Sequence, residues 1–262
     1  MIVKQREKKK AKFRISFVFL IIFASFAVCF TLYMKEDFQI TEDMFEDETE
    51  AVVYIDPVGQ SSFVENPVPQ SERQDESYYK DAVFVGSKAL AGLSDYGYVK
   101  SENMLISDSI KLDNFDTAVL SANGKESGIK DAVLQKNPSK VYIMVGLYDL
   151  DRLESADLFK GLESVIDGIR DENGELEIYL VSLLPVTAER ESDTASNTDI
   201  DAYNTLLIKF ANKVNVNYLD VNTNFKGNDG KLPSSYAETN GIRLSRETYE
   251  KFSEYILTHV RG

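Results

Sequence analysis

The sequence has few of the residues that metal sites and disulfides require: 262 residues include one cysteine, one histidine and no tryptophan. The single cysteine, Cys29, excludes an internal disulfide framework and a zinc site built on cysteines. The single histidine, His259, lies close to the carboxyl terminus, which argues against a histidine-ligated metal and an interior histidine base. We therefore expect no metal site and no cofactor.

Basic side chains are scarce outside the amino terminus. The chain has a net charge of −14 at pH 7, although residues 1–14 contain seven Lys or Arg side chains and one Glu. The rest of the chain is therefore strongly acidic. Nucleic acid is disfavoured as a partner, because proteins that bind it present basic surfaces.

Residues 15–34 form a run of twenty residues without a charge, ISFVFLIIFASFAVCFTLYM. A helix of this length spans a hydrocarbon core of about 30 Å. The basic tip at residues 1–14 predicts a cytoplasmic amino terminus and an extracytoplasmic remainder. A cleaved signal peptide is the alternative, but the run exceeds the usual apolar region of about 7–15 residues and no small-x-small cleavage site follows it. We predict a single-pass signal anchor in the cell membrane.

Residues 35–76 are acidic and polar and include Pro57, Pro67 and Pro69, a composition that predicts an extended linker. From residue 77 to residue 262, short apolar runs alternate with amphipathic stretches. Runs at 82–85, 140–145, 177–184 and 217–221 predict buried strands. For one further strand, residues 117–120 and 104–106 compete. Helical stripes are expected at Leu158/Leu162/Val165/Ile169, Ile200/Tyr203/Leu207/Phe210 and Tyr249/Phe252/Ile256/Val260. The alternation predicts an α/β fold with a parallel sheet between helices, whose sites lie at the carboxyl ends of the strands.

Three separated segments resemble the SGNH (GDSL-type) hydrolases. Residues 83–93 read VFVGSKALAGL, where the family reads like VFIGDSLTEGL, and residues 141–149 read VYIMVGLYD, where it reads like VYIMLGxND. The last family block, YLDV…DGxLP…Y…DGIHLN…Y, is similar to YLDV at 218–221, DGKLP at 229–233, Tyr236, NGIRLS at 240–245 and Tyr249. The resemblance implies a three-layer α/β/α, flavodoxin-like domain with about five parallel strands.

The resemblance also implies where catalytic groups would lie. In the family a Ser after Gly-Asp attacks an ester, an Asn helps hold the oxyanion, and a His three residues after an Asp is the base. Carried over by position, Lys88 replaces the nucleophile and Ser87 the Asp before it. Tyr148 replaces the oxyanion Asn, Asn240 the acidic residue and Arg243 the base. Arginine cannot act as a base near neutral pH, so the sequence predicts an inactive member.

Several roles remain open for these positions. Gly124 is the candidate for the glycine whose N–H the second family block supplies. Arg243 either forms a salt bridge to Asp149 that fills the cleft, or joins Lys88 and Tyr148 in a pocket for an anion. Asp149 alternatively caps the loop after its strand.

Three functions follow from different classes. The first is a membrane-tethered binding or scaffolding module, for which the resemblance suggests a cell-wall or surface polysaccharide, or a membrane acyltransferase, as partner. The second is an active esterase or acetyltransferase on acylated surface glycans that uses Ser87 and Lys88. The third is a purely structural envelope protein.

Overall fold

The structure is a computed structural model, and it describes residues 63–122, 124–191, 195–238 and 243–261. The predicted cytoplasmic tip and membrane anchor, most of the predicted linker, and Asn240 lie outside the described residues. Among the residues that are described, no helix has the length and apolar character needed to cross a membrane.

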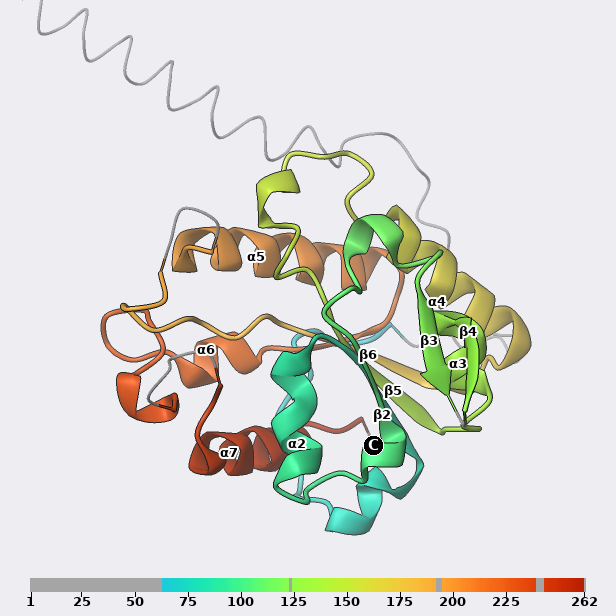
Figure 1. The fold of residues 1–262 in the computed structure, drawn as a ribbon, viewed down its shortest axis with the longest axis horizontal. Coiled ribbons are helices and arrows are strands. Elements are labelled where there is room, and N and C mark those ends of the chain that lie inside the picture. Colours follow the sequence, from blue (N-terminus) through green and yellow to red (C-terminus); the bar gives the residue numbers. More distant parts are fainter. Residues whose placement is uncertain (1–62, 123, 192–194, 239–242, 262) are drawn as a thin grey trace, which may run out of the picture. The chain divides into compact units, whose positions relative to one another are not determined.

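Five parallel strands form the central sheet, in the order β2-β1-β5-β6-β7. Their bounds are β1 Ala82–Gly86, β2 Met104–Ile106, β5 Lys140–Met144, β6 Glu177–Val181 and β7 Asn217–Leu219. Helices cover both faces, with α3, α4 and α5 on one side and α2, α6 and α7 on the other (Figure 1). The predicted α/β fold with a parallel sheet is therefore confirmed.

The middle of the sheet is held together by a ladder of aromatic rings. Phe84, Tyr142 and Tyr179 occupy the same register position on β1, β5 and β6. Neighbouring rings are stacked with centroids 4.8 Å apart, and all three side chains are fully buried. Cross-strand aromatic pairs stabilise a sheet beyond the area that they bury.

The competition for one strand is decided in favour of residues 104–106, which form β2 beside β1. Residues 117–120 were the competing run, and they do not join the parallel sheet. Instead β3 (Val119–Ala122) pairs antiparallel with β4 (Lys125–Gly128) in a separate hairpin. The physical reason is burial: the exposed and buried side chains of β3 alternate, whereas a parallel sheet inside an α/β fold needs strands buried on both faces.

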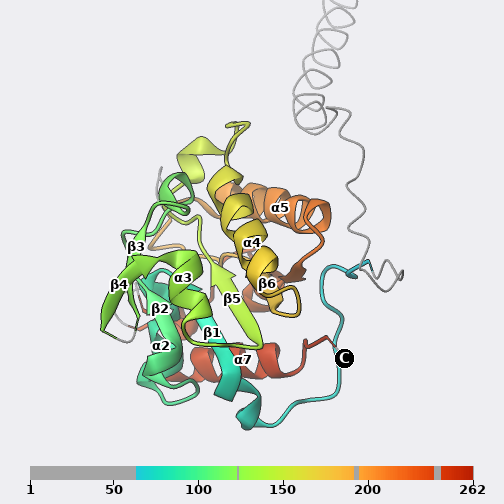
Figure 2. The same ribbon diagram turned by 90° about the vertical axis from the view of Figure 1, so that its right-hand side faces the viewer.

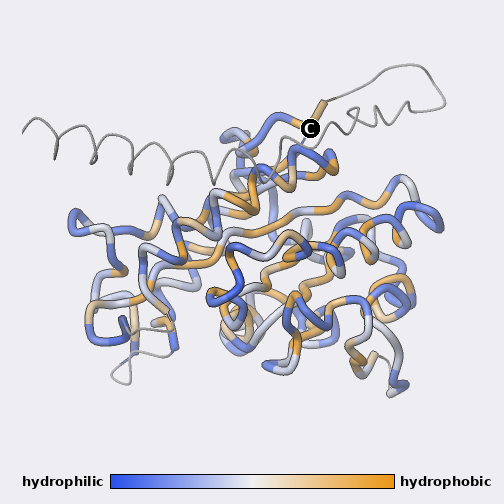
Figure 3. The backbone as a smooth tube through the Cα atoms, turned by 90° about the horizontal axis from the view of Figure 1, so that it is seen from above, coloured by the Kyte–Doolittle hydropathy of each residue, from blue (hydrophilic) through white to orange (hydrophobic). Residues whose placement is uncertain are grey.

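The residues of the predicted helical stripes are buried in the core. Figure 3 shows how apolar residues recur along the strands and helices. Two of the helices begin where a serine side chain accepts a backbone N–H: Ser196 from Asp199 at the start of α5, and Ser245 from Thr248 at the start of α7. The α-helices are α2 Ala91–Asp95, α3 Ile129–Leu134, α4 Lys160–Glu172, α5 Asn197–Lys213, α6 Val221–Phe225 and α7 Arg246–Leu257. The 3-10 helices are η1 Glu76–Asp81, η2 Lys88–Leu90, η3 Ser101–Asn103, η4 Leu112–Asn114, η5 Leu150–Arg152 and η6 Ser234–Tyr236.

The domain begins earlier than residue 77. Val68 is buried in the core, and its N–H donates to the carbonyl of Tyr218 on β7. The segment from residue 64 onward, coloured cyan in Figure 2, runs beside the carboxyl-terminal end of the chain. The described end of the predicted linker is therefore part of the domain rather than a solvated tether.

Candidate functional site

Two glycines shape the carboxyl ends of the central strands. Gly86 ends β1, and a Cβ there would lie 2.1 Å from the carbonyl oxygen of Met144 on β5. Gly146 follows β5 with a φ of +113°, and a Cβ there would lie 2.3 Å from the ring of Tyr203. Any other residue at these two positions would clash with its neighbours, so both glycines are needed for the loops at this edge of the sheet to keep their backbone positions.

Ser87 and Lys88 leave β1 with different environments. Ser87 is 8% exposed, and its Oγ accepts the N–H of Ala89 at 3.4 Å, so it caps the turn that starts η2. The Lys88 side chain is largely exposed and its Nζ lies 3.1 Å from Oδ2 of Asp108. The main-chain N–H of Lys88 donates to Oδ1 of the same carboxylate, also at 3.1 Å. One carboxylate thus binds both the ammonium and the backbone donor of Lys88.

Asp108 comes from the loop after β2, the strand next to β1. That loop is fixed because Ser107 donates its N–H to the carbonyl of Gly86 and its hydroxyl lies 2.7 Å from that of Ser109. Asp108 could not be selected from the sequence, because two runs compete there for the strand that precedes it. Its position could have indicated a role at the site. Asp108 is an acidic residue two places beyond β2, which lies beside β1, the strand that ends at Gly86.

Asp149 serves the backbone rather than a cation. Its carboxyl group is buried, and Oδ2 accepts the N–H of Leu112 at 3.0 Å. Burial raises the pKa of Asp149, and the hydrogen bonds from the backbone of Leu112 and Asp113 only partly offset this. The expectation that it fixes a loop fits this arrangement. Tyr148, beside it, has an exposed side chain.

Arg243 is engaged elsewhere, which corrects the expected salt bridge to Asp149. Its guanidinium pairs with Asp95 at the carboxyl end of α2, and its Nε lies 3.8 Å from Oε1 of Glu238. It also lies over the ring of Tyr96, 5.3 Å from the centroid. Partial burial acts to lower the pKa of Arg243, but Tyr96 and the carboxylates of Asp95 and Glu238 outweigh it and the pKa is raised. Arg243 therefore stays a cation.

The structure pairs each of the two cations expected in an anion pocket, Lys88 and Arg243, with acids of a different element. Lys88 is held by the loop after β2, and Arg243 by α2 and by Glu238. The roles proposed for these side chains in binding remain predictions.

Gly124 and His259 have local surroundings that account for each of them. Gly124 is the turn of the β3–β4 hairpin, with a φ of +76° and open space around it, so the structure gives it a conformational role there. His259 stacks on Tyr255 with ring centroids 3.8 Å apart, and its Nδ1 lies 2.8 Å from the carbonyl oxygen of Tyr255.

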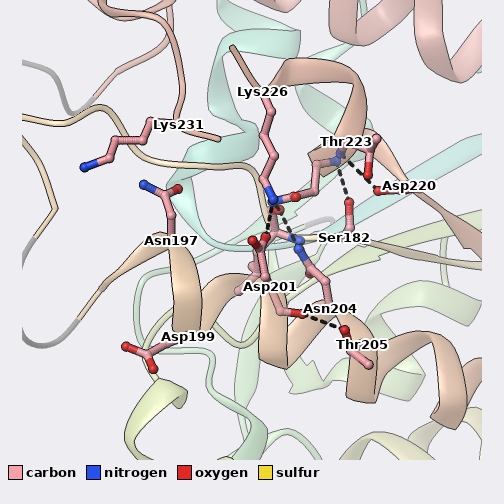
Figure 4. Close-up of polar contacts among 12 residues, drawn as sticks. Ser182, Asn197, Asp199, Asp201, Asn204, Thr205, Asp220, Thr223, Lys226 and Lys231 are labelled. Atoms are coloured by element: carbon pink, nitrogen blue, oxygen red, sulfur yellow. Dashed lines mark hydrogen bonds and ion pairs between the residues drawn. The ribbon is translucent and has the colours of Figure 1, made fainter. Parts of the chain in front are cut away.

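A second polar network lies where β6 and β7 end (Figure 4). The amide of Asn204 bonds to both the N–H and the carbonyl of Leu183, and the hydroxyl of Ser182 accepts the N–H of Asn222. Lys226 pairs with Asp201 on α5. These groups satisfy one another and fix the loop after β6. In the described ranges, no group of His, Cys, Asp and Glu side chains is arranged to hold a metal ion.

Comparisons with known proteins agree with the architecture. Residues 103–251 match the model of the GDSL-like Lipase/Acylhydrolase family. No curated protein matches the sequence significantly. Among solved structures, a candidate platelet activating factor from Streptococcus pneumonia is similar with a TM-score of 0.51 and 20% identity, over 67% of this chain and 81% of that chain. An acetyl xylan esterase, AlAXEase, is similar with a TM-score of 0.51 and 18% identity, over 69% of this chain and 99% of that chain. Since the family model covers more than half of the sequence, the chain belongs to the GDSL-like lipase/acylhydrolase family.

Proposed function

We propose that this family member is catalytically inactive and acts as a membrane-tethered, extracytoplasmic binding or scaffolding module in the acylation or deacylation of cell-envelope polysaccharides. The proposed loss of catalysis rests on one observation: the carboxylate of Asp108 accepts the main-chain N–H of Lys88 and forms an ion pair with its Nζ. Acyl transfer needs backbone donors that are free to stabilise a developing oxyanion. Here the main-chain N–H of Lys88, at the position expected for the nucleophile, already donates to the carboxylate of Asp108.

The surroundings of Arg243, His259 and Ser87 support the same proposal. Arg243 occupies the position expected for the base, and its acidic partners keep it charged. His259 lies on the residues that follow α7, with its Nδ1 against Tyr255. The hydroxyl oxygen of Ser87 accepts the N–H of Ala89. Among the described residues, no side chain accepts a hydrogen bond from this hydroxyl as a base would.

The proposed membrane anchor and the proposed polysaccharide partner are supported by other observations. The uncharged run at residues 15–34 supports a membrane anchor, and the charge asymmetry around it supports an extracytoplasmic domain. The fold shared with an acetyl xylan esterase supports an acylated polysaccharide as the class of partner molecule. A membrane acyltransferase is the alternative partner for this role.

A restoration series tests the proposal. The full chain in detergent would be assayed with p-nitrophenyl acetate and with an acetylated glycan, beside a variant carrying Lys88→Ser, Tyr148→Asn, Asn240→Asp and Arg243→His. A second variant adds Asp108→Ala to release the backbone donor. We expect turnover only in the restored chains, and more of it after Asp108 is removed.

The alternatives predict different results. An active esterase that uses Ser87 and Lys88 would turn over substrate in the native chain and lose that activity in Ser87→Ala and in Lys88→Ala. A purely structural envelope protein would show neither turnover nor glycan binding, and Lys88→Ala would change nothing that can be measured at this edge.

A further inference from the structure

Residues 64–74, called the strap here, complete the open edge of the sheet. β7 is the last strand of the sheet, so one side of its backbone has no neighbouring strand among the described residues. Along the first part of the strap every second residue faces the domain: Val64 and Asn66 are half-buried and Val68 is buried, while the residues between them are exposed. This period of two is that of an extended strand.

Asn66 replaces the backbone of a sixth strand with its side chain. Its Oδ1 accepts the N–H of Tyr218 at 2.7 Å, and its Nδ2 donates to the carbonyl of Val216 at 2.8 Å. Two residues later, the N–H of Val68 donates to the carbonyl of Tyr218 at 2.9 Å. Backbone groups at a sheet edge attract another strand when they are left unpaired. Here one amide side chain and one N–H occupy them.

The second half of the strap attaches to the end of α7. The N–H of Ser71 donates to the carbonyl of Thr258 at 2.7 Å, and the N–H of Gln74 to that of Leu257 at 2.8 Å. These are carbonyls that the end of a helix leaves unpaired. Arg73 forms a salt bridge to Glu254 at 2.8 Å, with both side chains nearly half exposed. This salt bridge therefore contributes little to the stability of the strap, because exposed ion pairs are screened by solvent.

The strap differs from the core in what holds it. Between residues 63 and 76 only Val68 is buried, so the strap depends on main-chain and amide hydrogen bonds rather than on apolar packing. Segments with few buried apolar contacts open at a lower free energy than the strands of a core.

We propose that the edge of β7 is a strand-acceptor surface, that this chain fills it with its own strap, and that the strap detaches as one unit while the five-stranded sheet stays folded. The segment that fits this edge is extended, with an asparagine whose amide reaches the backbone and an apolar residue two places later. In the sequence, the strap lies between the predicted anchor and η1. In a tethered chain, its release would add up to about 35 Å of reach, at ~3.3 Å for each extended residue.

Hydrogen exchange of the full chain in detergent, followed by mass spectrometry, tests this proposal. In the native chain the amides of Val68, Ser71 and Gln74 should exchange together, and faster than those of β1 and β5. The variant Asn66→Ala should speed this exchange by about tenfold or more, with β1 and β5 unchanged. The amides of Tyr218 and Val260, which donate to Asn66 and to Ser71 of the strap, should exchange faster as well.

Asn212→Ala is the matched control. Asn212 accepts one bond from the Nδ2 of Asn66 at 3.0 Å, and its loss leaves the bonds of Asn66 to β7 in place. We expect its exchange pattern to stay close to that of the native chain. The proposal is overturned if Asn66→Ala and Asn212→Ala behave alike. It is also overturned if the strap of the native chain exchanges no faster than β5, a result that does not depend on whether either variant folds.

Discussion

Asp149 offers a test of how the loop after β5 is built. Asp149→Ala would remove the acceptor of the Leu112 N–H, which lies 3.0 Å from Oδ2, at a position where both residues are about 1% exposed. A buried donor left without a partner costs about 1–3 kcal/mol. Asp149→Asn keeps an oxygen acceptor of nearly the same shape and removes the charge. We therefore expect Asp149→Ala to lose about 1–3 kcal/mol of the free energy of unfolding at pH 7, and Asp149→Asn to lose less.

The two variants also share a change in pH dependence. Burial raises the pKa of Asp149 in the folded protein above its unfolded value. As the pH rises from the unfolded value, near 3.9, toward the folded one, the unfolded state ionises first and the folded protein loses stability. Neither variant carries this group, so that part of the pH dependence should disappear in both.

Urea denaturation at pH 4 and pH 7 measures both effects. The reasoning is refuted if Asp149→Ala is as stable as Asp149→Asn at pH 7. It is equally refuted if the native chain and the two variants change in stability by the same amount between the two pH values.

Two other substitutions test the packing of buried tyrosines. Gly92→Ala places a Cβ 2.0 Å from the ring of Tyr249, which is 1% exposed. Overpacking should lower the free energy of unfolding by about 1–3 kcal/mol, despite the better helix propensity of alanine. Thermal unfolding checks this, and a variant as stable as the native chain would contradict it. Tyr203→Phe removes the hydroxyl that donates to the carbonyl of Val145 at 2.7 Å. The buried carbonyl is then left without its donor, which should lower the free energy of unfolding in urea by about 1–3 kcal/mol. A loss no larger than ~0.5 kcal/mol would show that water or a new partner replaces the hydroxyl.

The parallel sheet could be predicted because its strands are continuous apolar runs that end at Gly86, at Gly146 and close to Pro185. The hairpin at residues 119–128 was missed, although the Asn-Gly pair at 123–124 is a turn signal that favours a two-residue hairpin. Gly124 was instead considered as a donor to the site. Its positive φ and open surroundings explain the glycine by the turn alone.

The site and the strap were harder to predict because they depend on contacts between distant segments. Asp108 contacts Lys88 only because β2 lies beside β1, a pairing that the sequence left open. Asn66 contacts Tyr218 across 152 positions of the chain, and it lies in a stretch whose polar and proline-rich composition is typical of a linker. The sequence pattern places Arg243 in the last family block, but its partner Asp95 could not be identified before the position of α2 was known.

The most direct test of the central claim is the turnover of an acetyl ester by the native full chain, measured in detergent beside Ser87→Ala and Lys88→Ala. The account predicts no hydrolysis of p-nitrophenyl acetate or of an acetylated glycan above the uncatalysed rate in any of the three. Clear turnover by the native chain that either substitution abolishes would contradict it, because the Lys88–Asp108 arrangement would then have to open and present a working nucleophile.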